Sequence, residues 1–203
     1  MRNQESFSRY DVYTTAGSLY CYRETGTLIN RFNIRDAARL KTVEADIFAV
    51  KQNSLLNNPI KGRLSINHLC NIHKYFFGDL YYFAGHFRRE NIMKGKTLFA
   101  DKNEIKPKLE KLFTELKHEN YLKNLDRENL VKRSSYYLAE LNYIHPFREG
   151  NGRTSREFMR ILFSRCGYEI EWSAVTKEQF LNAAEWSVYD STKLEPIISK
   201  CLK

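Results

Sequence analysis

The chain has 203 residues, enough for one well-filled core, and 42% of them are hydrophobic and 28% charged, as in ordinary globular proteins. No apolar run approaches the roughly 18 residues that a membrane-spanning helix needs, so we expect a soluble protein. The formal net charge of +9 would suit nucleic acid, but acidic residues lie among the basic ones and no arginine-rich arm is present, so we expect an anionic substrate or an acidic partner instead.

The cysteines are scattered and form no C-x-x-C pair, which argues against a zinc site or a disulfide framework and for free thiols in a reducing cytosol. The N-terminal segment MRNQESFSRY lacks the apolar stretch of a secretory signal. We therefore expect a cytoplasmic protein that does not contact a membrane.

Sparse glycine and proline favour a helical protein. Apolar residues at helical spacing predict a first helix over residues 34–52. Ser65 is expected to cap a second helix that runs through SINHLCNIHKYFFGDLYYF. The stretch that follows breaks this pattern, and the strand character of residues 97–99 predicts a short hairpin around residues 94–96.

The second half of the chain predicts three more helical segments. One covers residues 106–119, and Asp126 caps the next, which should end at His145 because Pro146 disfavours helical backbone there. Another helix starts after Gly152 and is closed by Gly167. We therefore predict an all-α fold with one small β element and, since no linker or repeat is visible, a single domain over residues 1–203.

Residues 145–156, HPFREGNGRTSR, bring unusual chemistry into the loop between two of these helices. Glycines let backbone N–H groups approach an anion closely, and the start of the following helix adds partial positive charge, which together favour phosphate. Arg153 and Arg156 lie three residues apart in the first turn of that helix, so each guanidinium can bind phosphate oxygens.

Glu149 would repel a phosphate at this position unless a Mg²⁺ ion lay between them. His145 is then a titratable base that could take a proton from an attacking hydroxyl. This chemistry indicates transfer of a phosphorus group from a Mg²⁺-nucleotide to a hydroxyl, and it leaves open which phosphorus is attacked.

The stretch HPFREGNGRTSR resembles the motif of Fic domain proteins, HPFx(D/E)GNGRxxR, at every defined position. The segments IHKYFFGDLYYFAGHFRREN, IMKGKTLF and ELNYIHPF resemble the helix, the flap and the approach to the motif in that family. The resemblance covers most of the chain. It implies a Fic-type helical bundle with a small β-hairpin flap at about residues 86–100 and the motif loop at 145–156.

The resemblance also implies an activity, protein adenylylation (AMPylation), in which AMP passes from Mg-ATP to a Tyr, Thr or Ser hydroxyl of a target protein. By position, His145 is the catalytic base, Glu149 holds Mg²⁺, and Phe147 anchors the loop in the core. The flap would dock the target by strand pairing. The residues implied to bind the nucleotide are Gly150, Asn151, Gly152, Arg153 and Arg156, with Lys94 and Gly95 of the flap nearby.

Several alternatives remain open at this point. A kinase-like use of the scaffold occurs in the Doc branch, where lysine replaces the second motif glycine, whereas this chain has Gly152. Other Fic proteins transfer UMP or phosphocholine, or remove AMP. A non-catalytic basic binding module would be favoured by loss of the motif histidine or asparagine, and both are present.

Many Fic proteins carry an inhibitory helix, (S/T)xxxE(G/N), whose glutamate pairs with the second motif arginine, here Arg156. The nearest candidate, Ser191 with Glu195, departs from the pattern because Pro196 follows. We therefore expect inhibition by a separate, small antitoxin-like protein. The chain could be a toxin or an effector secreted into a host cell.

Other chemical groups have plainer interpretations. His68 and His73, five residues apart, are expected to be packed or solvated rather than metal ligands. Trp172 and Trp186 follow the motif helix, where the resemblance would allow adenine to stack, but both are expected in the core. Arg88, beside Arg89, is expected either on a solvated face or against an acidic target or a phosphate.

Overall fold

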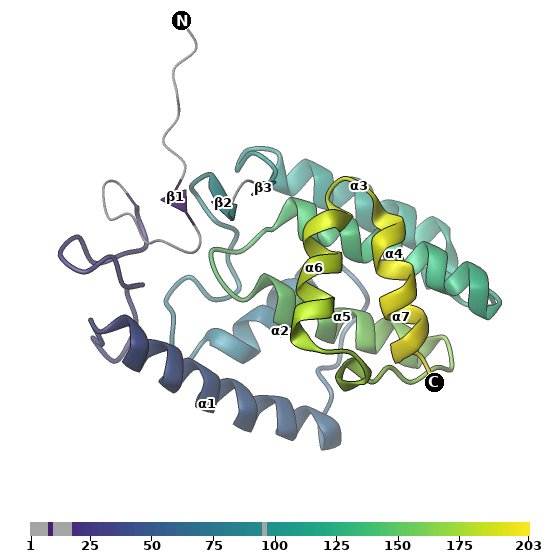
Figure 1. The fold of residues 1–203 in the computed structure, drawn as a ribbon, viewed down its shortest axis with the longest axis horizontal. Helices are drawn as coiled ribbons and strands as arrows, with labels where there is room; N and C mark the ends of the chain where they lie inside the picture. Colours follow the sequence, from purple (N-terminus) through teal and green to yellow (C-terminus); the bar gives the residue numbers. More distant parts are fainter. Residues whose placement is uncertain (1–7, 10–17, 95–96) are drawn as a thin grey trace, which may run out of the picture.

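The structure is a computed structural model that describes residues 8–9, 18–94 and 97–203. It is mostly helical (Figure 1). The α-helices are α1 (Ala37–Asn57), α2 (Ile66–Phe77), α3 (Ile105–His118), α4 (Arg127–Ile144), α5 (Asn151–Arg165), α6 (Lys177–Ser187) and α7 (Glu195–Cys201). Three 3₁₀ turns, η1 (Asn120–Leu122), η2 (Trp172–Ala174) and η3 (Ser191–Leu194), complete the helical part of the described chain.

Helices α4 and α5 lie at the centre of the bundle. Helix α5 packs against α2 and α4, while α3, α6 and α7 also contact α4. Helix α1 lies along the edge of the bundle, against α2 (Figure 1). One hydrophobic core, rich in phenylalanine, joins these elements. The loop between α4 and α5 is therefore held by two helices with little freedom to move apart.

The helix ends follow local capping chemistry. The Ser65 hydroxyl accepts from the His68 N–H at 3.3 Å, and the Asp126 carboxylate accepts from the Asn129 N–H at 2.8 Å, so both predicted caps are confirmed. The first helix begins at Ala37 rather than residue 34, because Asp36 caps it.

The second helix is shorter than its apolar run predicted. It ends at Phe77, with Gly78 at its C-cap, whereas the sequence pattern continued to Phe83. Leu80 and Tyr81 remain buried although they lie beyond the end of the helix. Apolar density alone therefore predicted burial correctly and helix length incorrectly.

The predicted hairpin is present: β2 (Ile92–Lys94) pairs antiparallel with β3 (Thr97–Leu98). A further strand, β1 (Ser8–Arg9), pairs in parallel with β2 and was not predicted, since two residues are too few to show a strand period. The described strands follow the order β1-β2-β3.

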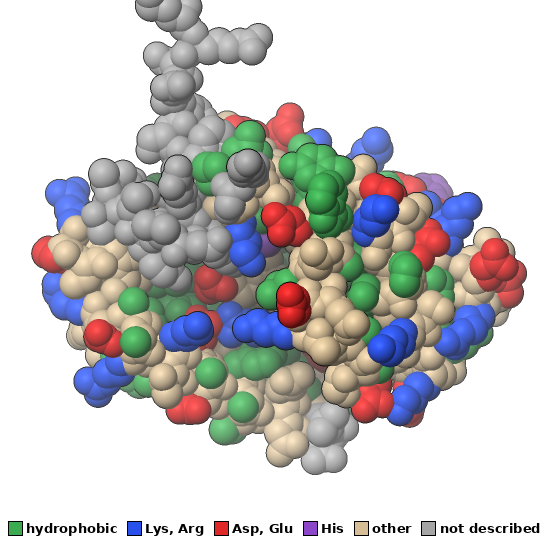
Figure 2. Space-filling model, viewed as in Figure 1, with side chains coloured by type: hydrophobic (Ala, Val, Ile, Leu, Met, Phe, Trp, Pro, Cys, Tyr) green, Lys and Arg blue, Asp and Glu red, His purple; other side chains and the backbone are tan. Residues whose placement is uncertain are grey.

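Three expectations from the sequence concern the charge distribution, a membrane-spanning helix and the cysteines. On the face drawn in Figure 2, Lys and Arg side chains are spread among Asp and Glu rather than gathered in one basic patch. Across the described part of the chain, no helix is both long and apolar enough to cross a bilayer. The four cysteines form no disulfide, as expected.

Candidate active site

Helix α4 ends at the motif as predicted. His145 adopts left-handed backbone angles (φ 46°, ψ 61°), and its N–H donates to the Leu141 carbonyl at 3.1 Å. Pro146 follows, so the chain leaves the helix axis at this residue.

The His145 imidazole is buried and fixed in direction. Its Nδ1 lies 3.0 Å from the Asn142 carbonyl oxygen, an acceptor, so Nδ1 carries the proton and Nε2 the lone pair. The ring stacks on Phe99, with centroids 3.7 Å apart. Burial, together with the charges of Arg88 and Lys94, lowers the pKa of His145 to about 3. The imidazole is therefore neutral near pH 7, and its Nε2 carries no proton.

Arg88 is buried beneath this residue, so neither a solvated face nor an acidic target describes its position. Its guanidinium donates to the carbonyls of His145 and Glu90, each at 2.8 Å, and also to those of Ile144 and Ala100. Helix α4 ends here with carbonyls that lack intrahelical donors, and the cation satisfies them. Burial lowers the pKa of Arg88 to about 10, which keeps it charged.

The loop after His145 is clamped by neutral groups. The Asn151 side chain accepts from the Phe147 N–H at 2.8 Å and donates to the Phe147 carbonyl at 2.7 Å. Phe147 is buried, as expected, and stacks on His73 with centroids 3.8 Å apart. His73 Nδ1 accepts from the Gly85 N–H at 2.8 Å, so its Nε2 donates to the Glu149 carbonyl at 2.9 Å. His73 therefore fixes the motif backbone and is no solvated side chain.

The start of α5 presents backbone rather than side chains. Gly150, the N-cap residue, has a φ of +81°, and its N–H donates to Glu149 Oε1 at 2.8 Å. The first N–H groups of a helix have no intrahelical acceptor, so this end can bind an anion. Because the Asn151 amide is engaged with Phe147, Asn151 would contact an anion through its backbone in this conformation.

Arg153 lies between two carboxylates. Its Nη2 is 2.6 Å from Glu44 Oε1 on α1 and 3.4 Å from Glu149 Oε1. The guanidinium lies over the Phe77 ring, 4.6 Å from its centroid. Burial raises the pKa of Glu149, and the Glu44 charge raises it further. Sequence reasoning missed Glu44 and its partner Tyr81, whose hydroxyl donates to Glu44 Oε2.

Arg156 faces an aromatic ring. Its guanidinium lies 4.9 Å from the centroid of Phe180 on α6, and burial lowers its pKa to about 10. Among the described residues no ion pair involves Arg156, so Glu195 at the start of α7 does not pair with it here. Trp172 packs edge-on against Phe180 at 5.6 Å, whereas Trp186 is 56% exposed, so the expectation of core packing was wrong for Trp186.

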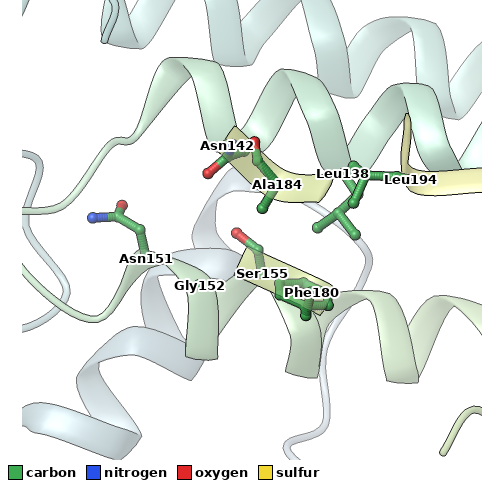
Figure 3. Close-up of a pocket in the computed structure, with 8 residues that line it drawn as sticks. All are labelled: Leu138, Asn142, Asn151, Gly152, Ser155, Phe180, Ala184 and Leu194. Atoms are coloured by element: carbon green, nitrogen blue, oxygen red, sulfur yellow. Dashed lines mark hydrogen bonds between the residues drawn. The ribbon is translucent and has the colours of Figure 1, made fainter. Parts of the chain in front are cut away.

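A small cavity adjoins the motif between α4, α5 and α6 (Figure 3). Its volume is about 20 Å³, which is room for roughly one water molecule and far too little for a nucleotide base. Its lining consists of Leu138, Asn142, Asn151, Gly152, Ser155, Phe180, Ala184 and Leu194. A nucleotide would therefore bind outside this cavity.

The residues around Glu149 fit a metal ion that arrives with its substrate. The described residues contain no cluster of three or more His, Cys, Asp or Glu side chains able to hold a metal alone. Mg²⁺ is usually held by one or two carboxylates together with substrate phosphates and water. Glu149 beside the anion-binding end of α5 satisfies that pattern.

The flap residues are placed only in part. Lys94 ends β2, and its charge helps to lower the pKa of His145. Its place near a nucleotide stays a prediction. Gly95 lies outside the described residues.

The chain is similar to known proteins in both sequence and fold. The Fic/DOC family pattern matches residues 63–163. The chain is 36% identical over 182 residues to the protein adenylyltransferase VbhT of Bartonella schoenbuchensis, covering 90% of this chain and 38% of that protein. It is 36% identical to the probable protein adenylyltransferase y4lH of Sinorhizobium fredii, covering 84% of this chain and 88% of that protein. The fold matches the BepC effector protein of Bartonella tribocorum with bound AMPPNP, with a TM-score of 0.83 and 26% identity over 91% of this chain and 96% of that one.

Proposed function

Because the chain belongs to the Fic/DOC family, we propose that it is a protein adenylyltransferase, an enzyme that transfers AMP from Mg-ATP to a Tyr, Thr or Ser hydroxyl of a target protein. The observation that carries the proposal is the state of His145. Its imidazole is neutral, held through Nδ1, and attached to the loop that leads into the anion-binding end of α5.

In the proposed reaction, His145 Nε2 takes the proton of the target hydroxyl as its oxygen attacks the α-phosphorus of ATP. The bond from that phosphorus to the bridging oxygen breaks, and pyrophosphate leaves. The N–H groups of Asn151 and Gly152 would receive the phosphate charge, joined by that of Gly150 once it no longer donates to Glu149. Arg153 and Arg156 would hold the outer phosphates.

Glu149 is the proposed holder of Mg²⁺. The ion, when bound, would neutralise charge on the phosphates. Burial and the negative charge of Glu44 raise the pKa of Glu149. A cation nearby would act in the opposite direction and favour the ionised form of Glu149.

The residue at position 152 favours AMP transfer over the kinase-like alternative, in which lysine replaces this glycine. A Cβ atom there would meet only Arg156 Nη1, at 3.6 Å, so the glycine leaves open space beside the first turn of α5. That space would accept the outer phosphates of an ATP molecule bound for AMP transfer.

Two kinds of protein partner follow from the proposal. The target would dock along β3, the strand at the outer edge of the described sheet, because β1 already pairs with β2 on the other side. A small antitoxin-like protein would supply a glutamate to Arg156, which lies on the Phe180 ring with no ion pair from the described residues. Either a toxin or a secreted effector would use such a site.

The proposal is tested by labelling cell lysate with the purified chain and ATP labelled at either the α- or the γ-phosphate. We expect a protein band labelled only from α-labelled ATP, and we expect His145→Ala to abolish it. A band labelled only from γ-labelled ATP would establish kinase-like transfer instead.

A further inference from the structure

Arg88 joins three separate segments of the chain at the base of the flap. Its Nη1 donates to the Glu90 carbonyl at 2.8 Å, just before β2, and its Nη2 donates to the Ala100 carbonyl, just after β3. Its Nε donates to the His145 carbonyl at 2.8 Å, and Nη2 is also 3.3 Å from the Ile144 carbonyl oxygen. One planar guanidinium therefore holds both ends of the hairpin on the end of α4.

Main-chain hydrogen bonds connect the same segments. The Arg88 N–H donates to the Pro146 carbonyl at 2.8 Å, and the Ala100 N–H donates to the Tyr143 carbonyl at 3.1 Å. Each of these bonds fixes one end of the hairpin against the chain around His145. The Arg88 side chain adds the link between the two ends, because it alone of these groups bonds to both.

The flap also touches the His145 imidazole directly. Phe99 follows β3 (Thr97–Leu98), the strand proposed to dock the target, and its ring stacks on His145 with centroids 3.7 Å apart. The docking strand and the ring that contacts the imidazole are thus consecutive in the chain, so a shift of one moves the other. A hydroxyl on the docked target keeps its distance from His145 Nε2 only while this segment keeps its place.

We propose that Arg88 is a positioning residue for the transfer step, which sets the place of the flap, and with it the docked target, relative to His145. This inference rests on the proposed function, because it takes β3 to dock a target hydroxyl. The bonds of Arg88 described above go to the flap and to the end of α4, whereas the nucleotide is proposed to bind at the start of α5. Loss of Arg88 therefore misaligns the target more than it weakens nucleotide binding.

The test measures binding and transfer separately in Arg88→Lys, which keeps a basic side chain but replaces the planar fork by one amine. Titration calorimetry with AMPPNP in Mg²⁺ buffer gives the nucleotide affinity and the number of sites able to bind it. Labelling of lysate protein from α-labelled ATP then gives the initial rate per competent site. We expect the affinity, and the ATP concentration for half-maximal labelling, to stay within about twofold of wild type. We expect the rate per site to fall by roughly tenfold to a hundredfold, as for a misplacement of about 1 Å.

Arg133 offers a matched control. Its guanidinium also joins separate elements, because it donates from α4 to Glu115 on α3 at 2.8 Å and to Glu119, just after α3, at 2.9 Å. It precedes His145 along α4 by roughly 18 Å. Arg133→Lys should lower the stability of the protein and leave the rate per competent site unchanged.

A second variant and a second measurement locate the effect. Asp101 is half-buried at the same end of the hairpin and accepts from the Asn91 side chain at 2.8 Å, so Asp101→Ala loosens the base of the flap without emptying a buried site. It should lower the rate per site by a smaller factor than Arg88→Lys, and it carries the comparison if Arg88→Lys does not fold. In either variant the amides of β2 and β3 should exchange with deuterium faster than in wild type, whereas those in the second half of α5 should not.

The outcomes are separable. An unchanged rate per competent site in Arg88→Lys would show that Arg88 only stabilises the fold. A loss of AMPPNP affinity as large as the loss of rate would show that it acts on the nucleotide, and either result would overturn this inference alone. Wild-type protein that binds no AMPPNP, or that labels no protein from α-labelled ATP, would overturn the proposed function and the inference with it.

Discussion

Two glycines of the motif should respond to alanine in opposite ways. Gly150 has a φ of +81°, and a Cβ atom there would lie 2.2 Å from Cε2 of Phe77, which is buried. A left-handed backbone costs an alanine roughly 1–2 kcal/mol. Forcing extra volume into a packed core costs roughly 1–3 kcal/mol more. Gly150→Ala should therefore lose about 2–5 kcal/mol of unfolding free energy, or roughly 5–15 °C in Tm for a chain of this size.

Gly152 has no such constraint. Its Cβ would meet Arg156 Nη1 at 3.6 Å, an ordinary contact, and it lies inside α5 where alanine is favoured by about 1 kcal/mol. Gly152→Ala should keep or raise the Tm. The added methyl group would occupy the space proposed for the outer phosphates, so the transfer rate should fall by at least about tenfold.

Thermal unfolding and the α-label transfer assay, run on both variants, check this contrast. Equal Tm values for Gly150→Ala and wild type would show that the loop can move away from Phe77, and the packing argument would be wrong. Full transfer activity in Gly152→Ala would show that the phosphates do not pass that side of α5.

Further predictions concern the groups around the motif. His145 and His73 each have a pKa of about 3 when folded and about 6.5 when unfolded, so the unfolded state binds more protons between these values and stability falls as the pH is lowered. Urea unfolding should show a loss of about 2 kcal/mol per imidazole from pH 7.5 to pH 5, and His145→Ala should remove half of that pH dependence. Arg88→Met leaves several buried carbonyls without a donor and should cost roughly 3 kcal/mol or more; a Tm within about 2 °C of wild type would contradict this. Phe180→Leu removes the ring beneath Arg156 and should weaken binding of ATP but not of AMP, which lacks the outer phosphates; calorimetry with both nucleotides decides.

Local signals in the sequence predicted the elements that bracket the motif. Asp126 and Pro146 mark the two ends of α4, and Gly167, at φ +86°, follows the C-cap of α5. Each signal acts within a few residues of the backbone it controls, so one sequence suffices to interpret it. That the whole chain forms a single domain remains a prediction.

The supporting residues could not be predicted in this way. Arg88 stands beside Arg89, and in the sequence the two resemble a solvated pair. In the structure Arg88 is buried, and it donates hydrogen bonds to carbonyls from three separate segments of the chain. Glu44 lies among charged neighbours on α1, so its sequence context gives no sign of burial. Both roles depend on contacts between distant parts of the chain, which a periodic pattern does not report.

The guanidinium of Arg156 connects the stability of the protein to its affinity for phosphate. Arg156 lies on the Phe180 ring instead of in water, and burial lowers its pKa to about 10. A cation that has lost water without gaining a full ionic partner destabilises the folded protein. A phosphate that binds it need not displace that water again, so less of its interaction energy is lost to desolvation. The desolvation cost of Arg156 and its capacity to bind a triphosphate thus have the same physical origin, and a substitution that relieves one should weaken the other.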